Sequence, residues 1–119
     1  MRIISGYLKG KNILLPSDKK TRPLKDMVRE SIFNIIEHTK SFNFNIENST
    51  VLDLFSGTGS FGIECISRGA SQVFFNENYS LALEILRKNI HNLKCEDKCK
   101  INNYDCFNID QLNNMNDNQ

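Results

Sequence analysis

The chain has 119 residues, of which 39% are hydrophobic and 24% are charged, and its formal net charge is +1. This length fits one globular domain, and four cysteines are too few for a disulfide-based scaffold. The sequence contains neither an apolar run of the ~18–20 residues that a transmembrane helix requires nor the long apolar stretch of a signal peptide. We therefore expect a soluble, cytoplasmic protein with no membrane partner.

The near-neutral total hides an uneven charge distribution. Residues 1–40 contain nine Lys or Arg and four Asp or Glu, whereas residues 41–119 contain six and ten. A basic N-terminal third suits contact with phosphate groups, although a solvated lysine-rich surface has the same composition. We therefore divide the chain into a basic region at 1–40, a core at 41–110 and a polar tail at 111–119 that is predicted to be disordered.

Residues 1–40 are predicted to form a β-hairpin followed by a helix. Apolar runs at 2–4 and 12–15 flank a turn bounded by glycines, which is the pattern of two paired strands. Pro23 suits the first turn of a helix, and the apolar residues after it recur at the spacing of an amphipathic helix. That apolar stripe consists of Leu24, Met27, Val28, Ile32, Ile35 and Ile36, widened by Phe33.

From residue 50 onward, predicted strands and helices alternate. Strands are expected at 51–55, 72–75 and 100–102, and helices at 60–67 and 80–93. This β-α-β-α-β order predicts an α/β fold, the first half of a doubly wound, mostly parallel sheet. Because such folds normally use five or more strands, we expect a truncated version whose open sheet edge is available to a partner chain.

A glycine-rich loop follows the first of these strands. Gly57, Gly59 and Gly62 satisfy G-x-G-x-x-G between a strand and a helix, and Glu77 follows at the tip of the next strand. Such glycines let the backbone approach a ligand, and such an acid binds ribose hydroxyls. Taken alone, this pattern predicts a dinucleotide site of the NAD type.

The residues around the glycines favour S-adenosylmethionine instead. Asp53 precedes the loop by four residues, where its carboxylate would repel a pyrophosphate but attract the ammonium group of a methionine. An acid after the third strand, Asp105, is positioned to accept a hydrogen bond from an adenine amine. NAD and a ligand-free βα turn remain alternatives. The predicted cofactor-binding residues are Asp53, Phe55, Ser56, Gly57, Thr58, Gly59, Glu77 and Asp105.

Several blocks of sequence, in one order, resemble the bacterial small-subunit (16S) ribosomal RNA guanine-N2 methyltransferase family, the RsmD-like proteins. These blocks lie at 2–6, 9–11, 21–23, 28–35, 51–60, 62–64 and 67–70. The resemblance implies a Rossmann-like methyltransferase fold and methyl transfer from S-adenosylmethionine to rRNA or the small subunit. It assigns Asp53, Gly57 and Gly59 to the methionine end of the cofactor, Glu77 to its ribose and Asp105 to its adenine. It implies that the N-terminal region faces RNA through Arg2, Lys9, Lys11, Arg22 and Arg29.

One motif of amine methyltransferases is missing from the sequence. These enzymes carry Asp/Asn-Pro-Pro-Tyr/Phe, which binds the target amine and stacks on the base, whereas this sequence has prolines only at 16 and 23. We therefore assign no catalytic residue and expect the chain alone to be weakly active or inactive. A non-catalytic RNA-binding remnant or a truncated gene product is the alternative.

The histidine and cysteines of the last third are also compatible with a metal site. His91, Cys95, Cys99 and Cys106 form a possible zinc set, but their spacing differs from that of structural zinc sites. Reduced thiols are the favoured interpretation, and we predict no metal.

Overall fold

The structure, a computed structural model, describes residues 1–16, 26–39 and 45–103. The helix start predicted at Pro23 and the tail predicted at 111–119 lie outside these residues. No helix in the described part is long and apolar enough to cross a membrane. In chain order, the elements are α1 (Asp26–His38), β1 (Thr50–Asp53), α2 (Ser60–Ser67), β2 (Gln72–Asn76), α3 (Ser80–Asn92), the 3-10 turn η1 (Glu96–Lys98) and β3 (Cys99–Asn102).

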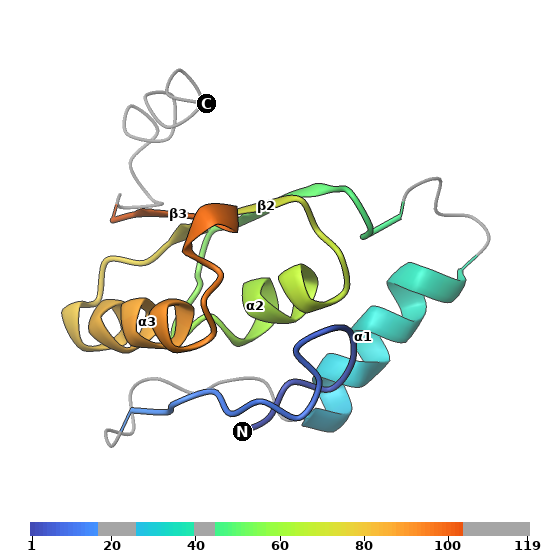
Figure 1. The fold of residues 1–119 in the computed structure, drawn as a ribbon, viewed down its shortest axis with the longest axis horizontal. Helices are drawn as coiled ribbons and strands as arrows, with labels where there is room; N and C mark the ends of the chain where they lie inside the picture. Colours follow the sequence, from blue (N-terminus) through green and yellow to red (C-terminus); the bar gives the residue numbers. More distant parts are fainter. Residues whose placement is uncertain (17–25, 40–44, 104–119) are drawn as a thin grey trace.

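The three strands form a parallel sheet in the order β1-β2-β3. Helices α2 and α3 lie on one face of this sheet (Figure 1). On the other face, Leu52 of β1 is 45% exposed. The predicted α/β class and parallel order are therefore confirmed. Among the described residues, no strand pairs with the second edge of β1.

Helix α2 is buried on nearly all sides: seven of its eight residues are buried, including the polar Ser60, Glu64 and Ser67. Ile63 and Ile66 are fully buried, and so are Val73 and Phe75 of the strand that α2 covers. Gly62 permits this close packing, since a Cβ placed there would lie 2.3 Å from the Phe75 ring. The third glycine of the motif thus serves helix–sheet contact rather than ligand approach.

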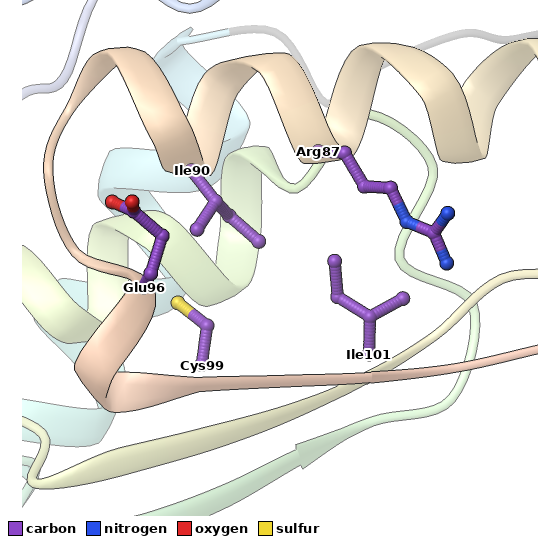
Figure 2. A pocket seen from close by; sticks show the side chains of 5 residues that line it. All are labelled: Arg87, Ile90, Glu96, Cys99 and Ile101. Carbon is purple, nitrogen blue, oxygen red and sulfur yellow. The ribbon is translucent and has the colours of Figure 1, made fainter.

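A pocket separates α3 from β3 (Figure 2). Ile90 and Arg87 enter it from α3, and Cys99 and Ile101 enter it from β3. None of the residues that line this pocket belongs to the glycine loop at 56–62. The pocket is therefore distinct from the edge where the glycine loop lies.

The predicted N-terminal hairpin is shorter than expected. Within residues 1–16, one antiparallel bridge forms, between Arg2 and Asn12, with backbone bonds such as Ile3 N–H to the Lys11 carbonyl (2.9 Å) beside it. The reason is that other elements accept the N–H groups a longer ladder would use. Ser5 N–H, for example, donates to the Glu64 side chain (3.0 Å).

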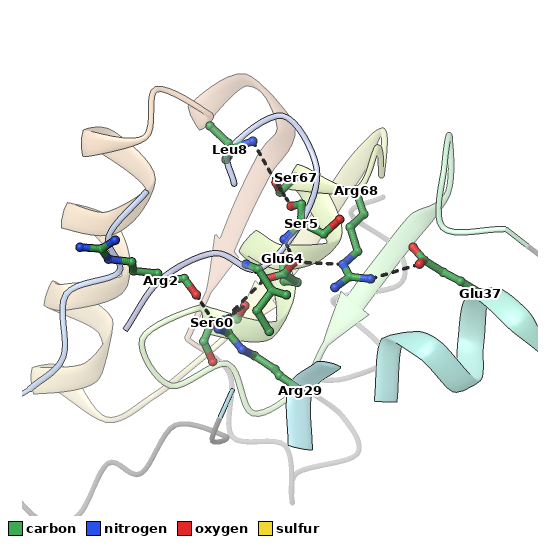
Figure 3. Close-up of polar contacts among 10 residues, drawn as sticks. Arg2, Ser5, Leu8, Arg29, Glu37, Ser60, Glu64, Ser67 and Arg68 are labelled. Atoms are coloured by element: carbon green, nitrogen blue, oxygen red, sulfur yellow. Dashed lines mark hydrogen bonds and ion pairs between the residues drawn. The ribbon is translucent and has the colours of Figure 1, made fainter. Parts of the chain in front are cut away.

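The buried carboxylate of Glu64 on α2 accepts several of these N–H groups (Figure 3). Ile4 N–H and Ser5 N–H donate to its two oxygens at 2.9 and 3.0 Å. Arg68 donates to it at 3.0 Å, and the buried Arg29 guanidinium lies 3.7 Å away. Four donors or cations from three parts of the chain therefore meet at one carboxylate.

The predicted helix α1 is confirmed, but only part of its predicted apolar stripe is buried. Met27 and Ile35 of the apolar stripe are 78% and 55% exposed. The buried face carries the predicted Phe33, which stacks on the Phe61 ring (centroids 4.9 Å apart). It also carries the charged Arg29, which pairs with the buried Glu64. The ion pair between Arg29 and Glu64 therefore places a charged residue on the buried face, where the hydrophobic pattern predicts apolar residues.

Two glycines in the N-terminal turn allow a matched test of whether this turn packs against α2. Gly6 and Gly10 both have positive φ, but a Cβ on Gly6 would lie 1.8 Å from the Ser67 carbonyl oxygen, whereas one on Gly10 meets nothing within 4 Å. Gly10→Ala should therefore cost only backbone strain, about 1–2 kcal/mol of unfolding free energy. Gly6→Ala should cost about 1–3 kcal/mol more because of the clash. Urea unfolding of both variants measures this, and equal losses would show that the turn does not dock on α2.

Candidate functional site

The candidate site lies at the carboxyl ends of β1 and β2, where open parallel sheets bind ligands. The loop after β1 is hydrogen-bonded to the end of β2. Ser56 N–H donates to the Asn76 carbonyl (3.1 Å), and Asn76 N–H donates to the Ser56 hydroxyl (3.0 Å). The Asn76 side chain donates to the Leu54 carbonyl (3.2 Å). Ser56 and Asn76 thus fix the path of the glycine loop.

The first two glycines of the motif allow the loop to turn sharply. Gly57 and Gly59 have φ of 56° and 93°, in the left-handed region that disfavours other residues. A Cβ on Gly59 would also lie 2.5 Å from the Leu86 side chain of α3. The loop therefore has both a special backbone conformation and close contact with the helices below it.

The carboxylate of Glu77 joins the glycine loop to the end of β2. One oxygen accepts Gly57 N–H at 2.7 Å, and the other accepts Tyr79 N–H at 3.0 Å. Glu77 N–H in turn donates to the Asn102 carbonyl of β3 (3.0 Å). Because each carboxylate oxygen has two acceptor positions and Glu77 is only partly buried, both oxygens can accept a further hydrogen bond.

Asp53, the last residue of β1, is mostly buried beneath the loop. Burial, together with a smaller effect of the nearby Glu77 charge, raises the pKa of its carboxyl from 3.8 to about 6. Hydrogen bonds from the backbone N–H groups of Phe55 and Gly62 oppose this shift. The Oδ2 atom is buried without a hydrogen-bond partner. A cationic donor beside Asp53 would therefore relieve an electrostatic cost that the fold now carries.

The other predicted cofactor residues differ in accessibility. Phe55 is 68% exposed, whereas Ser56 and Thr58 are buried. The Ser56 hydroxyl is engaged with the backbone of Asp53 (2.9 Å), and the Thr58 hydroxyl is buried without a partner. Asp105, like the predicted RNA contact Arg22, lies outside the described residues.

The basic N-terminal residues separate into two groups. Arg2, Lys9 and Lys11 are exposed, as a phosphate-binding surface requires. Arg29 is fully buried and donates to the Arg2 carbonyl (2.7 Å). The expectation that Arg29 faces RNA is therefore wrong, because its guanidinium supports the fold beside Glu64.

The possible zinc set does not assemble within the described residues. There, no group of three or more His, Cys, Asp or Glu is placed to hold a metal ion. Cys95 and Cys99 lie 3.9 Å apart, whereas His91 approaches Glu96 (3.4 Å). Cys106 lies outside the described residues.

Sequence reasoning missed Asn89 of α3, which is 1% exposed. Its amide donates to the Thr58 carbonyl of the glycine loop at 2.9 Å. The available signal was its position among the apolar residues Leu86 and Ile90, where a polar side chain must find buried partners.

Replacement of Asp53 by asparagine tests the buried charge. Since the pKa of this carboxyl is about 6 in the fold and 3.8 in the reference state, the folded chain binds more protons between these values. Wild-type stability should therefore fall as pH rises through this window, relative to Asp53→Asn, by at most about 3 kcal/mol. Urea unfolding of both proteins from pH 4 to 8 measures the difference. A constant difference would contradict the burial of a charged Asp53.

Comparisons with known proteins agree with this fold. The chain is 36% identical over 94 residues to "Putative rRNA methyltransferase YlbH" of Bacillus subtilis, covering 79% of this chain and 48% of the relative. It is 36% identical over 95 residues to "Ribosomal RNA small subunit methyltransferase D" of Haemophilus influenzae, with coverages of 80% and 46%. The chain thus spans about half the length of these relatives.

A solved structure extends the agreement to the backbone. "Putative methyltransferase yhhF from Escherichia coli" superposes with a TM-score of 0.73 at 28% identity, covering 88% of this chain and 52% of that chain. The Rossmann-like methyltransferase fold is thereby confirmed. Residues 1–118 match the family model described as "Conserved hypothetical protein 95". The chain belongs to this family, the RsmD-like family that its sequence blocks resemble.

Proposed function

We propose that this chain carries the S-adenosylmethionine-binding half of a methyltransferase that acts on the N2 amine of a guanine in small-subunit rRNA. The observation that carries the cofactor assignment is the pair of carboxylates at the glycine loop, Asp53 and Glu77. Two negative groups disfavour the pyrophosphate of a dinucleotide but suit a cationic ligand. The relatives named as rRNA methyltransferases support the RNA substrate.

Glu77 is suited to a ribose. Its two oxygens are already oriented by Gly57 N–H and Tyr79 N–H, so the carboxylate needs little reorganisation to accept two neighbouring hydroxyl groups. Preorganised acceptors of this kind lower the cost of binding. We assign Glu77 to the ribose diol of the cofactor.

Asp53 is suited to the ammonium group of the methionine moiety, because its Oδ2 atom accepts no hydrogen bond in the fold. Gly57 and Gly59 let the backbone approach the same moiety. When bound, the cofactor supplies an electrophilic methyl group on its sulfonium. The contribution of these residues is to bind and orient it.

We assign RNA contact to the exposed Arg2, Lys9 and Lys11, which would bind phosphates and position the substrate without reading its sequence. The turn that carries Lys9 docks on Ser67 at the carboxyl end of α2, whereas the glycine loop meets the opposite end of α2. An eight-residue helix is about 12 Å long. Contacts at the turn would therefore hold RNA at a distance from the reacting base.

Isothermal titration tests the cofactor assignment. We expect the 119-residue chain to bind S-adenosylhomocysteine or S-adenosylmethionine and not NAD. Asp53→Ala should abolish measurable binding, since the ammonium would lose its partner. Glu77→Gln, which keeps the shape but loses the charge, should weaken binding about tenfold.

Tighter binding of NAD than of S-adenosylmethionine would favour the dinucleotide alternative. Binding of rRNA without any binding of cofactor would favour the alternative that the chain is a non-catalytic RNA-binding remnant.

The missing amine-binding motif makes a separate prediction about catalysis. We expect the purified 119-residue chain to transfer tritiated methyl groups to small-subunit rRNA no faster than a blank without protein. The reason is that residues 1–119 contain no Pro-Pro pair to orient the target amine. A matched reaction with a full-length relative serves as the positive control, and methylation clearly above the blank would refute the prediction.

A further inference from the structure

Asn89 is a buried amide whose donors and acceptor are all engaged. Its Oδ1 accepts Leu14 N–H at 2.7 Å. Its Nδ2 donates to the Thr58 carbonyl at 2.9 Å and to the Leu14 carbonyl at 3.2 Å. A buried polar group is costly unless it is hydrogen-bonded. A single side chain of α3 therefore satisfies backbone groups from two distant segments.

One of these segments is the glycine loop itself. The Thr58 carbonyl belongs to the peptide that joins Thr58 to Gly59, and Gly59 N–H at the other side of this peptide donates to the Ser56 carbonyl (2.9 Å). Because a peptide unit is planar, fixing its carbonyl and its N–H fixes its orientation. Asn89 and Ser56 together thus hold the central peptide of the loop.

The other segment is the N-terminal arm, which we define as residues 1–16. The two bonds between Asn89 and Leu14 form a closed pair, with donation in both directions. At its far end, the arm is held by Ser67, whose hydroxyl accepts Leu8 N–H (3.0 Å) and donates to the Ser5 carbonyl. Asn89 and Ser67 therefore bind the same arm through similar bonds, but only Asn89 also contacts the glycine loop.

We propose that Asn89 is a positioning residue that orients the glycine loop for the cofactor and joins it to the N-terminal arm. This inference rests on the proposed function. The inference also extends the proposed function. Asn89 contacts both the loop proposed to bind the cofactor and the arm that carries the proposed RNA contacts Arg2, Lys9 and Lys11. Loss of Asn89 frees the Thr58 carbonyl and Leu14 together. A ligand that orders the loop in turn stabilises the arm.

Asn89→Ala and Ser67→Ala form a matched pair for the test. Both remove side-chain bonds to the N-terminal arm, and urea unfolding measures how much stability each loses. Titration of the full chain with S-adenosylhomocysteine then measures affinity in the absence of urea. We expect Asn89→Ala to weaken binding about tenfold, because a buried carbonyl loses its donor, and Ser67→Ala to change it less than twofold.

Hydrogen exchange without ligand provides a readout that does not depend on cofactor binding. Asn89→Ala should speed exchange in peptides covering both 54–62 and 12–16, whereas Ser67→Ala should speed it only in peptides covering 3–11. In the wild type, S-adenosylhomocysteine should slow exchange at 12–16 as well as in the loop, and Asn89→Ala should remove the effect at 12–16.

The outcomes separate this inference from the proposed function. If the wild type binds S-adenosylhomocysteine and Asn89→Ala binds it equally well, the positioning role is wrong and the cofactor assignment stands. Equal weakening by both variants means that Asn89 acts only through stability, which also overturns the inference. If the wild type does not bind, the cofactor assignment fails. Hydrogen exchange then decides whether Asn89 orients the loop, and unchanged exchange at 54–62 excludes it.

Discussion

The described structure depends on the compensation of a buried carboxylate. Glu64 is fully buried on α2, and a buried charge is tolerated only when cations and hydrogen-bond donors surround it. Its partners come from the N-terminal arm, from Arg29 of α1 and from Arg68, the residue directly after α2. The arm, α1 and α2 must therefore assemble together. Since α2 begins at the glycine loop, this requirement also fixes the base on which the candidate site is built.

The candidate site also contains carboxylates, and these have fewer hydrogen-bond donors and cations around them than Glu64 has. Glu77 is oriented by backbone N–H groups, and Asp53 keeps one carboxyl oxygen buried without a partner. Backbone-anchored acceptors and a destabilised carboxyl create a region that favours a ligand with hydroxyl groups and a positive charge. Asn89 connects this region to the N-terminal arm, so cofactor and RNA contacts need not be independent features of the chain.

The sequence predicted the elements of the βαβαβ core within one or two residues, because strand runs, glycines and helical periodicity are local signals. It did not predict that Arg29 of α1 is buried, since the ion pair of Arg29 with Glu64 joins residues far apart in the chain. The length of the hairpin and the role of Asn89 also depend on residues that are far apart in the sequence. Asn89, for example, binds Leu14 and Thr58, which are both distant from it in the chain. Interactions of buried polar side chains were therefore the part that sequence patterns could not reveal.

We propose that the glycine loop and the end of β2 form a cofactor site within this chain. Titration of the isotope-labelled chain with S-adenosylhomocysteine, followed by amide chemical shifts in nuclear magnetic resonance spectra, shows where this ligand binds. We expect the largest shifts at Gly57, Gly59, Glu77 and Tyr79, with smaller ones at Leu14. Saturable shifts confined to the pocket between α3 and β3, or no shifts at all, would contradict it.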